Sequence, residues 1–119
     1  MSTISAANIS DGTDTVGTGY VVNGSAKAWV NFNGSGTIAV RDSLNVTSLT
    51  DLATGSTLVN LTSAFSNTNF AEVACSNGNM SSLDQADKTT TRFRIKAQNA
   101  SGTGVSATLQ TGHAMGDLA

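Results

Sequence analysis

Strict alternation of apolar and polar residues is the feature that most constrains how this chain folds. Over residues 92–97 every second residue is apolar, and the residues between them are Arg or Lys. Residues 26–33 repeat the pattern, and Trp29 falls on the side opposite the apolar set that includes Phe32. A period of two places alternate side chains on opposite faces of a β-strand. Both segments are therefore predicted to be strands with one face in a core.

Turn signals rich in Gly, Asn and Asp divide the rest of the chain into further short strands. Within one of them, Ala71, Val73 and Cys75 share a face that is predicted to be buried. No segment has a convincing helical period. About seven short strands predict an all-β fold, an antiparallel β-sandwich in preference to a small barrel. The further strands are expected at residues 37–41, 44–48, 58–62, 70–76 and 105–109.

The chain divides into three parts by pattern. Residues 1–25 predict an extended N-terminal arm, which either stays mobile or docks on a partner through Ile4, Ile9 and Tyr20. Residues 26–110 predict the sandwich domain, with a long exposed polar loop at 76–90. Residues 111–119 carry no strong pattern and are expected to form a C-terminal tail.

Composition excludes several classes of partner. Ser, Thr, Asn and Gly make up 55 of the 119 residues, charged residues are 12%, and the net charge is −2. No run of Lys or Arg provides a nucleic-acid footprint, and no apolar run is long enough to span a membrane. Residues 1–10 do not read as a secretory signal. With one cysteine, the protein is expected to be made in a reducing cytosol without an internal disulfide.

Catalytic residues are hard to assemble from this sequence. The only histidine, His113, lies in the expected tail, and the only cysteine, Cys75, is 38 positions away. Most of the acids fall in predicted turns, where Asp supports the backbone. Asp84 and Asp87 could hold calcium with loop carbonyls, but their spacing matches no EF-hand loop. We therefore expect no enzyme, no cofactor and no metal site.

One block of sequence resembles a known family. Residues 24–43 read GSAKAWVNFNGSGTIAVRDS, and residues 44–51 continue as LNVTSLTD. This block resembles a β-rich module of bacteriophage virion proteins, especially of marine phages, which is usually described as tail fibre or virion structural protein. The resemblance is good over 24–75 and weaker over 92–110. Residues 51–61 lack the family's aromatics, and residues 76–90 have no counterpart that aligns.

The resemblance implies a β module on the particle surface that assembles as a homotrimer and has no catalytic residues. A tail-fibre or tail-tip component that contacts the host surface is therefore expected, made in the host cytoplasm and located in the virion. Its partners would be copies of itself, other virion proteins and a host glycan or protein. The residues assigned to subunit contacts are Trp29 and Phe70, and those assigned to the host receptor are Asn77, Asn79, Asp84 and Gln85.

Two other functions remain open from the sequence. A capsid decoration, or cement, protein would grip the phage head through the arm, with Ile4 and Ile9 filling pockets on the capsid protein. Such a protein stabilises the shell by binding the assembled lattice. A carbohydrate-binding module is a more remote alternative, because Trp29 lacks a second aromatic residue for a stacking platform.

Overall fold

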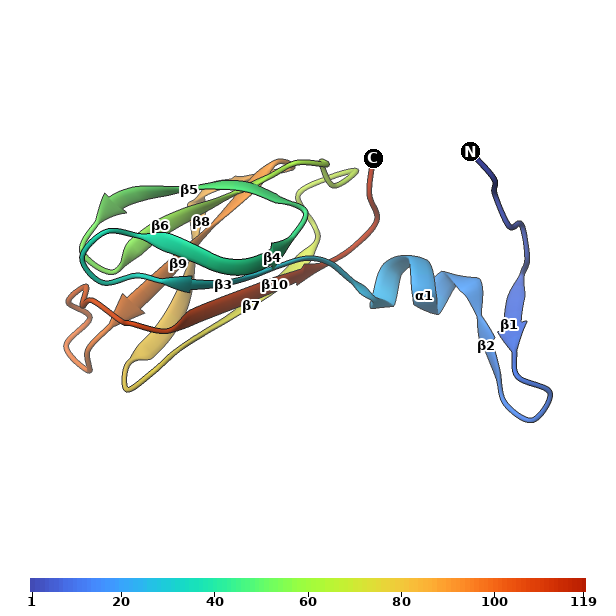
Figure 1. The fold of residues 1–119 in the computed structure, drawn as a ribbon, viewed down its shortest axis with the longest axis horizontal. Helices are drawn as coiled ribbons and strands as arrows, with labels where there is room; N and C mark the ends of the chain where they lie inside the picture. The colour runs from blue at the N-terminus through green and yellow to red at the C-terminus, as the bar shows by residue number, and fades with distance from the viewer.

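The computed structural model describes residues 1–119, and its regular secondary structure is antiparallel strands together with one short helix (Figure 1). Eight strands form two four-stranded sheets, ordered β4-β3-β10-β7 and β5-β6-β9-β8. The all-β antiparallel sandwich predicted from the alternating pattern is thus confirmed, with eight strands in place of about seven. These strands are β3 (Ala26–Asn33), β4 (Ala39–Leu44), β5 (Val46–Ala53), β6 (Ser56–Leu61), β7 (Ala71–Ser76), β8 (Met80–Thr89), β9 (Arg92–Gln98) and β10 (Gln110–Met115).

The core lies between the two sheets and is built from the inward face of each alternating strand. Val30 and Phe32 on β3 face Phe93 and Ile95 on β9, and all four are buried. Burial of each such side chain contributes roughly 1.5–3 kcal/mol. At the end of the sandwich nearer the arm, the core is closed by the stacked rings of Phe65 and Phe70, whose centroids are 4.1 Å apart.

The chain first passes from one sheet to the other at a corner made by a single residue. Asn45 separates β4 from β5 and adopts a left-handed conformation with φ of 57°. Its side chain binds the loop after β6, where Oδ1 accepts from the Ser63 amide at 2.6 Å and Nδ2 donates to the Ser63 carbonyl at 3.1 Å. Asn tolerates this conformation better than other residues with a side chain, so the corner is encoded by residue type.

The outer edges of both sheets are protected against pairing with other strands. Bulges interrupt β4 at Arg41 and β5 at Thr47 and Leu52, and β8 loses its register between Asp84 and Thr89. Bulges twist an edge and make it a poor template for further strands. The regular edge strand β7 lies against β8, which is held there by an ion pair described below. Addition of a further strand at these edges is therefore disfavoured.

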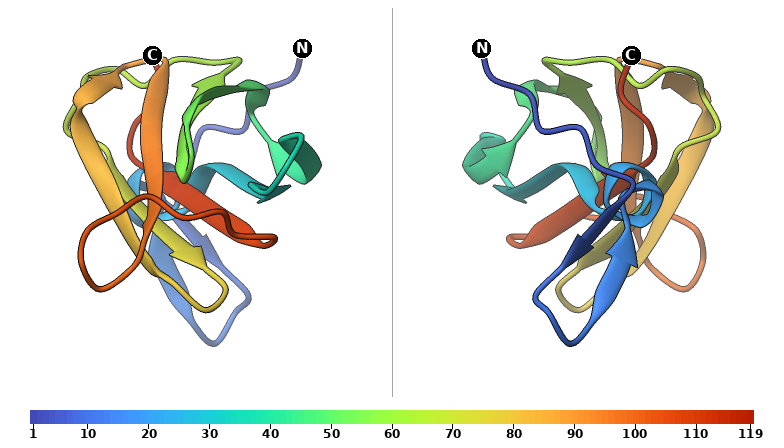
Figure 2. Two further views of the ribbon diagram at one scale, coloured as in Figure 1. Left: turned by 90° about the vertical axis from the view of Figure 1, so that its left-hand side faces the viewer. Right: turned by 90° about the vertical axis from the view of Figure 1, so that its right-hand side faces the viewer.

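The sequence predicts an extended arm, but the arm of the structure is folded. It contains a hairpin of β1 (Asn8–Ser10) and β2 (Thr15–Gly17), followed by the helix α1 (Thr18–Gly24), none of whose residues is buried. These elements project from one end of the sandwich, and the whole molecule measures 50 × 28 × 24 Å (Figures 1 and 2). Residues 18–24 include two Gly and two Val, which favour helix poorly, so the sequence carried no helical signal.

Three predictions in the second half of the chain were wrong. The polar segment 76–90 is a tight turn followed by the strand β8, and the sandwich extends through β10 into the segment expected to be a tail. The expected strand at 105–109 is irregular, and only Ala107 in it is buried. β8 and β10 were missed because Ser, Thr and Gly interrupt their apolar pattern, and pairing with neighbouring strands determines their conformation.

Because the strands are antiparallel, their connecting loops lie at the two ends of the sandwich, and these ends differ. The arm, the Asn45 corner and the C-terminus lie at one end, and four loops lie at the opposite end, on the left in Figure 1. We call these loops the distal tip. They comprise residues 34–38, 54–55, 77–79 and 99–109.

Candidate functional site

The distal tip is uncharged and rich in amides and hydroxyls. Its four loops contain no Asp, Glu, Lys or Arg. Two of them are locked together, because a Cβ on Gly55 would overlap the backbone of Val105 and one on Gly104 would overlap the carbonyl of Thr54. The tip is therefore a packed polar surface, in which two loops have no room for a side chain at their contact.

One open hollow lies between the turn after β7 and the end of β9. It has a volume of about 480 Å³ and includes Asn79, Met80, Gln98 and Asn99 in its lining. Asn99 Oδ1 accepts from the amides of Ser101 and Thr103, at 2.9 and 3.0 Å. Asn79 Nδ2 donates to the carbonyl of its neighbour Asn77 at 3.1 Å. Each of these two amides is thus held by one of its ends. We call this cavity the tip hollow.

A second hollow of about 180 Å³ lies on the other side of the same turn, between β7 and the loop before β10. Asn77 lines it and is fixed by the facing loop, since Asn77 Oδ1 accepts from the Leu109 amide at 2.9 Å. Asn77 Nδ2 donates to Thr108 Oγ1 at 3.2 Å. The structure thus brings two of the four predicted receptor residues, Asn77 and Asn79, to the distal tip.

The other two predicted receptor residues lie along β8, away from the tip. Asp84 forms ion pairs with Lys96 at 2.6 Å and with Arg94 at 3.3 Å. The hydrogen bond from Lys96 holds the pKa of Asp84 below its ordinary value of 3.8. Gln85 Nε2 donates to Glu72 Oε1 at 3.2 Å. Both side chains bind residues on adjacent strands, so the structure gives them a role in joining strands.

The two predicted subunit-contact residues have different environments. Phe70 is buried in the core, where it stacks on Phe65 and meets the edge of Phe93, so its assignment to a subunit surface is corrected. Trp29 lies half-buried on the outer face of the β4-β3-β10-β7 sheet. Cross-strand pairing places Leu44 and His113 beside it. Its contact with another subunit stays a prediction.

The same outer face corrects the prediction that Cys75 is buried. Cys75 is exposed, as are Ala71 and Val73, because β7 turns its other face toward the second sheet. That inward face carries Glu72, which binds Lys88 of β8 at 2.6 Å. The apolar pattern alone predicted the opposite orientation, since nothing in the sequence indicates the buried ion pair.

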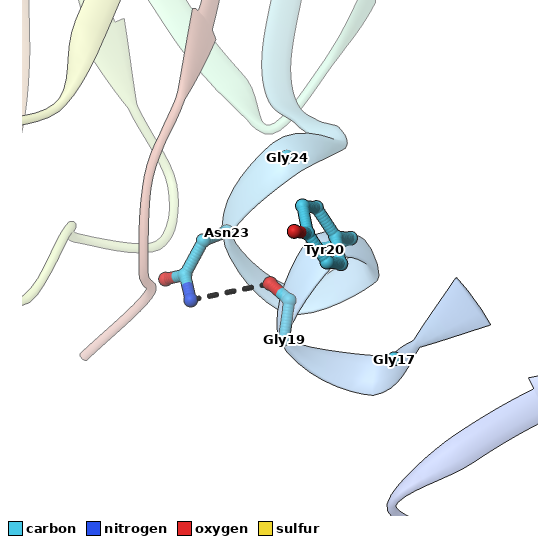
Figure 3. A pocket seen from close by; sticks show the side chains of 5 residues that line it. All are labelled: Gly17, Gly19, Tyr20, Asn23 and Gly24. Carbon is cyan, nitrogen blue, oxygen red and sulfur yellow. Dashed lines mark hydrogen bonds between the residues drawn. The ribbon is translucent and has the colours of Figure 1, made fainter.

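The arm leaves its predicted docking residues uncovered by the chain itself. Ile4, Ile9 and Tyr20 are 94%, 51% and 79% exposed. Tyr20 borders a hollow of about 430 Å³ against α1, whose other lining residues are three glycines and an asparagine (Figure 3). In this hollow Asn23 Nδ2 donates to the Gly19 carbonyl at 3.3 Å. The arm therefore presents apolar side chains and a bare helical backbone to its surroundings.

No group of three or more His, Cys, Asp or Glu side chains in the structure is placed to hold a metal ion. No helix combines the length and apolar character needed to cross a membrane. His113 is exposed on β10, not in a tail, and shares a shallow hollow of about 90 Å³ with Cys75. No carboxylate lines that hollow to orient the imidazole as in a hydrolytic triad.

Sequence reasoning missed three lining residues of the tip hollow, Met80, Gln98 and Asn99. The segment that begins at Asn99 was predicted to be a turn, but its proximity to the turn at 77–79 depends on the pairing of β8 with β9. The Asn- and Gly-rich composition of both turns is the signal that could have grouped them.

Comparison of the chain with protein-family models, with curated protein sequences and with solved structures found no match.

Proposed function

We propose that this protein is a non-catalytic structural component of a bacteriophage particle, namely a tail-fibre or tail-tip protein. In this proposal it assembles as a homo-oligomer, is attached to the particle through its arm and faces the host surface with its distal tip. The observation that carries the proposal is the chemical difference between the two ends of the molecule. Apolar attachment residues project at one end, and uncharged polar loops lie at the other end. The sequence resemblance over residues 24–75 supports the same conclusion.

The arm supports attachment because it does not bury its own apolar side chains. A helix as short as α1 is unstable in water without tertiary contacts. Burying Tyr20 or Ile4 in a partner stabilises the complex by roughly 1.5–3 kcal/mol for each side chain. Residues 15–26 carry no charge, and the charges of the arm are confined to the hairpin turn, at Asp11 and Asp14, and to the chain terminus, so the uncharged segment around α1 suits an apolar groove. These features favour an arm that acquires its stability on assembly.

Capsid decoration is the second candidate, and one observation favours it. The arm is a separate unit of hairpin and helix at one end of a single sandwich, which suits a protein that binds a lattice one copy at a time. Cement proteins of this design bind the assembled shell and stabilise it by mass action.

The number of copies per virion separates the two candidates. Virions of the phage that encodes this chain would be purified and probed with an antibody, by immunogold labelling and by band densitometry. Gold on the tail, with a few to tens of copies, supports the tail component. Gold over the head, with hundreds of copies, supports capsid decoration. A chain that is absent from purified virions would contradict both.

A further inference from the structure

We infer that the tip hollow binds an uncharged saccharide, through Asn79 and Asn99 as its polar contacts and Met80 as its apolar one. This inference rests on the proposed function, because it names the class of host molecule that the distal tip would contact.

Charge selects the ligand class first. No ionised side chain lines the tip hollow. Arg41 reaches another part of the distal tip, where it donates to the Thr108 carbonyl. The Asp84, Arg94 and Lys96 ion pairs lie on the outer face of the β5-β6-β9-β8 sheet. Recognition of sulfate, phosphate or carboxylate groups relies on Arg, Lys or similar donors. A sialylated or sulfated glycan would find no such partner in the tip hollow. The ligand favoured by this surface is polar but neutral.

The free hydrogen-bonding atoms of the tip hollow favour a ligand with hydroxyl groups. No bond within the chain uses Asn79 Oδ1, an acceptor, or Asn99 Nδ2, a donor, because only the opposite end of each amide is engaged. Hydroxyl groups act both as donors and as acceptors, so a sugar supplies partners for the free acceptor and for the free donor. Since internal bonds already fix both amides, binding loses little side-chain freedom.

The apolar part of the hollow is small. Met80 is 62% exposed and Ala100 lies beside it, which provides a limited surface for the C–H face of a sugar ring. A stable protein interface buries about 800 Å² on each partner and relies on Tyr, Trp or Arg anchors. The distal tip contains none of these three residues. A short saccharide therefore suits the tip hollow better than a protein partner does.

The test is a titration of the full-length ¹⁵N-labelled chain, followed by amide chemical shifts. The probes are neutral oligosaccharides of four to six units built from glucose, galactose or N-acetylglucosamine, each with a sulfated counterpart. We expect saturable shifts centred on Asn79, Gln98 and Asn99 with at least one neutral probe, and weaker binding of its sulfated form.

One substitution tests the proposed donor without disturbing its loop. Asn99→Asp keeps the oxygen that accepts from Ser101 and Thr103, but it replaces the free donor by a charged acceptor. We expect this variant to bind the neutral probe at least roughly tenfold more weakly, with an unchanged Tm. The matched control is Asn69→Asp at the opposite end of the molecule, whose side chain makes no hydrogen bond within the chain; it should leave affinity unchanged.

Three results of the titrations with saccharide probes would overturn the inference. These are the absence of saturable shifts with every neutral probe, preferential binding of a sulfated probe, and shifts centred on Trp29 instead of the tip hollow. Shifts that depend on protein concentration alone would identify a second copy as the occupant and would also overturn it. None of these results bears on incorporation into virions, which is measured separately, so the proposed function can survive the failure of this inference.

Discussion

At the scale of single residues, two polar features lie in or beside the apolar core: the Gln110 amide and the ion pair of Glu72 with Lys88. Gln110 on β10 is fully buried between the sheets, and neither end of its amide has a hydrogen-bond partner within the chain. A Cβ on Gly34 would overlap this amide, so the loop after β3 packs directly on it. A buried polar group left unpaired costs about 1–3 kcal/mol.

Gln110→Met is predicted to stabilise the protein by about 1 kcal/mol or more, because it keeps the length of the side chain and removes the unpaired amide. Urea denaturation followed by circular dichroism measures the change. Gln98→Met serves as the control, since Gln98 makes hydrogen bonds to Ser82 and Gly102 and its loss should destabilise. A lower stability for Gln110→Met would show that the amide is satisfied and required.

Glu72 and Lys88 form the one ion pair in which both side chains are nearly buried, at 4% and 9% exposure. Lys88 Nζ also donates to the Phe70 carbonyl at 2.7 Å and lies 4.2 Å from the centre of its ring. Removing one partner of such a pair leaves a buried charge without compensation, at a cost of about 3 kcal/mol or more.

A double-mutant cycle tests this pair. Glu72→Leu and Lys88→Met should each destabilise strongly, whereas the double variant should lose much less than both changes added together. The unfolding free energies of the four proteins give the coupling. Additive losses would mean that the pair does not hold β7 against β8.

At the scale of elements, strands were predictable where alternation was clean. β3 and β9 follow their apolar period and supply much of the core. β8 and β10 are polar or contain Gly, and only their neighbours make them strands. The predicted orientation of β7 was wrong, because Glu72 lies on the inward face, where it pairs with Lys88. α1 was missed because its residues have poor helix propensity. Of the candidate site, Asn77 and Asn79 were predicted, whereas their grouping with Asn99 depends on the pairing of β8 with β9.

The turn between β5 and β6 offers a sharp test of how the distal tip is packed. Gly55 has φ of 69°, and an added Cβ would overlap the carbonyl of Ala97 and the backbone of Val105. Gly55→Ala should destabilise by about 3 kcal/mol or more, from backbone strain together with that overlap. Gly36→Ala shares the positive φ but has open space, so it should cost only about 1 kcal/mol. Equal losses in thermal unfolding would contradict the packed tip.

The ion pairs between β8 and β9 predict a specific acid dependence. Lys96 holds the pKa of Asp84 in the folded protein below 3.8. The contribution of the Asp84 carboxylate to stability is therefore present above pH 3.8 and is lost as the pH falls through the lower pKa of the folded state. Asp84→Asn should therefore have a lower Tm than the wild type at pH 6, and the gap should close as the pH falls well below about 4. Asp51→Asn, which removes an acid without an ion pair, is the control. A difference in Tm between Asp84→Asn and the wild type that persists at pH 2 would mean that the variant loses packing and not an ion pair.

At the scale of the whole molecule, the arm and the distal tip lie at opposite ends of one sandwich. The core is made by β3–β10, and no residue of the arm belongs to it. The arm and the distal tip are separated by the length of the sandwich. The stability of the domain should therefore be independent of the arm.

Removal of residues 1–20 is predicted to leave a folded domain whose Tm lies within a few degrees of the full chain. Circular dichroism and amide dispersion by NMR would check this outcome. Loss of folding would show that the arm contributes to the core, although none of its residues is buried.

The most direct test of the proposed function is incorporation of the chain into virions with and without its arm. Full-length and 21–119 forms would be supplied to phage lacking the gene, and gradient-purified particles would be quantified for each. We expect the full chain to be present at a fixed copy number and the folded 21–119 form to be absent. Equal incorporation of both forms, or absence of both, would contradict the proposed function.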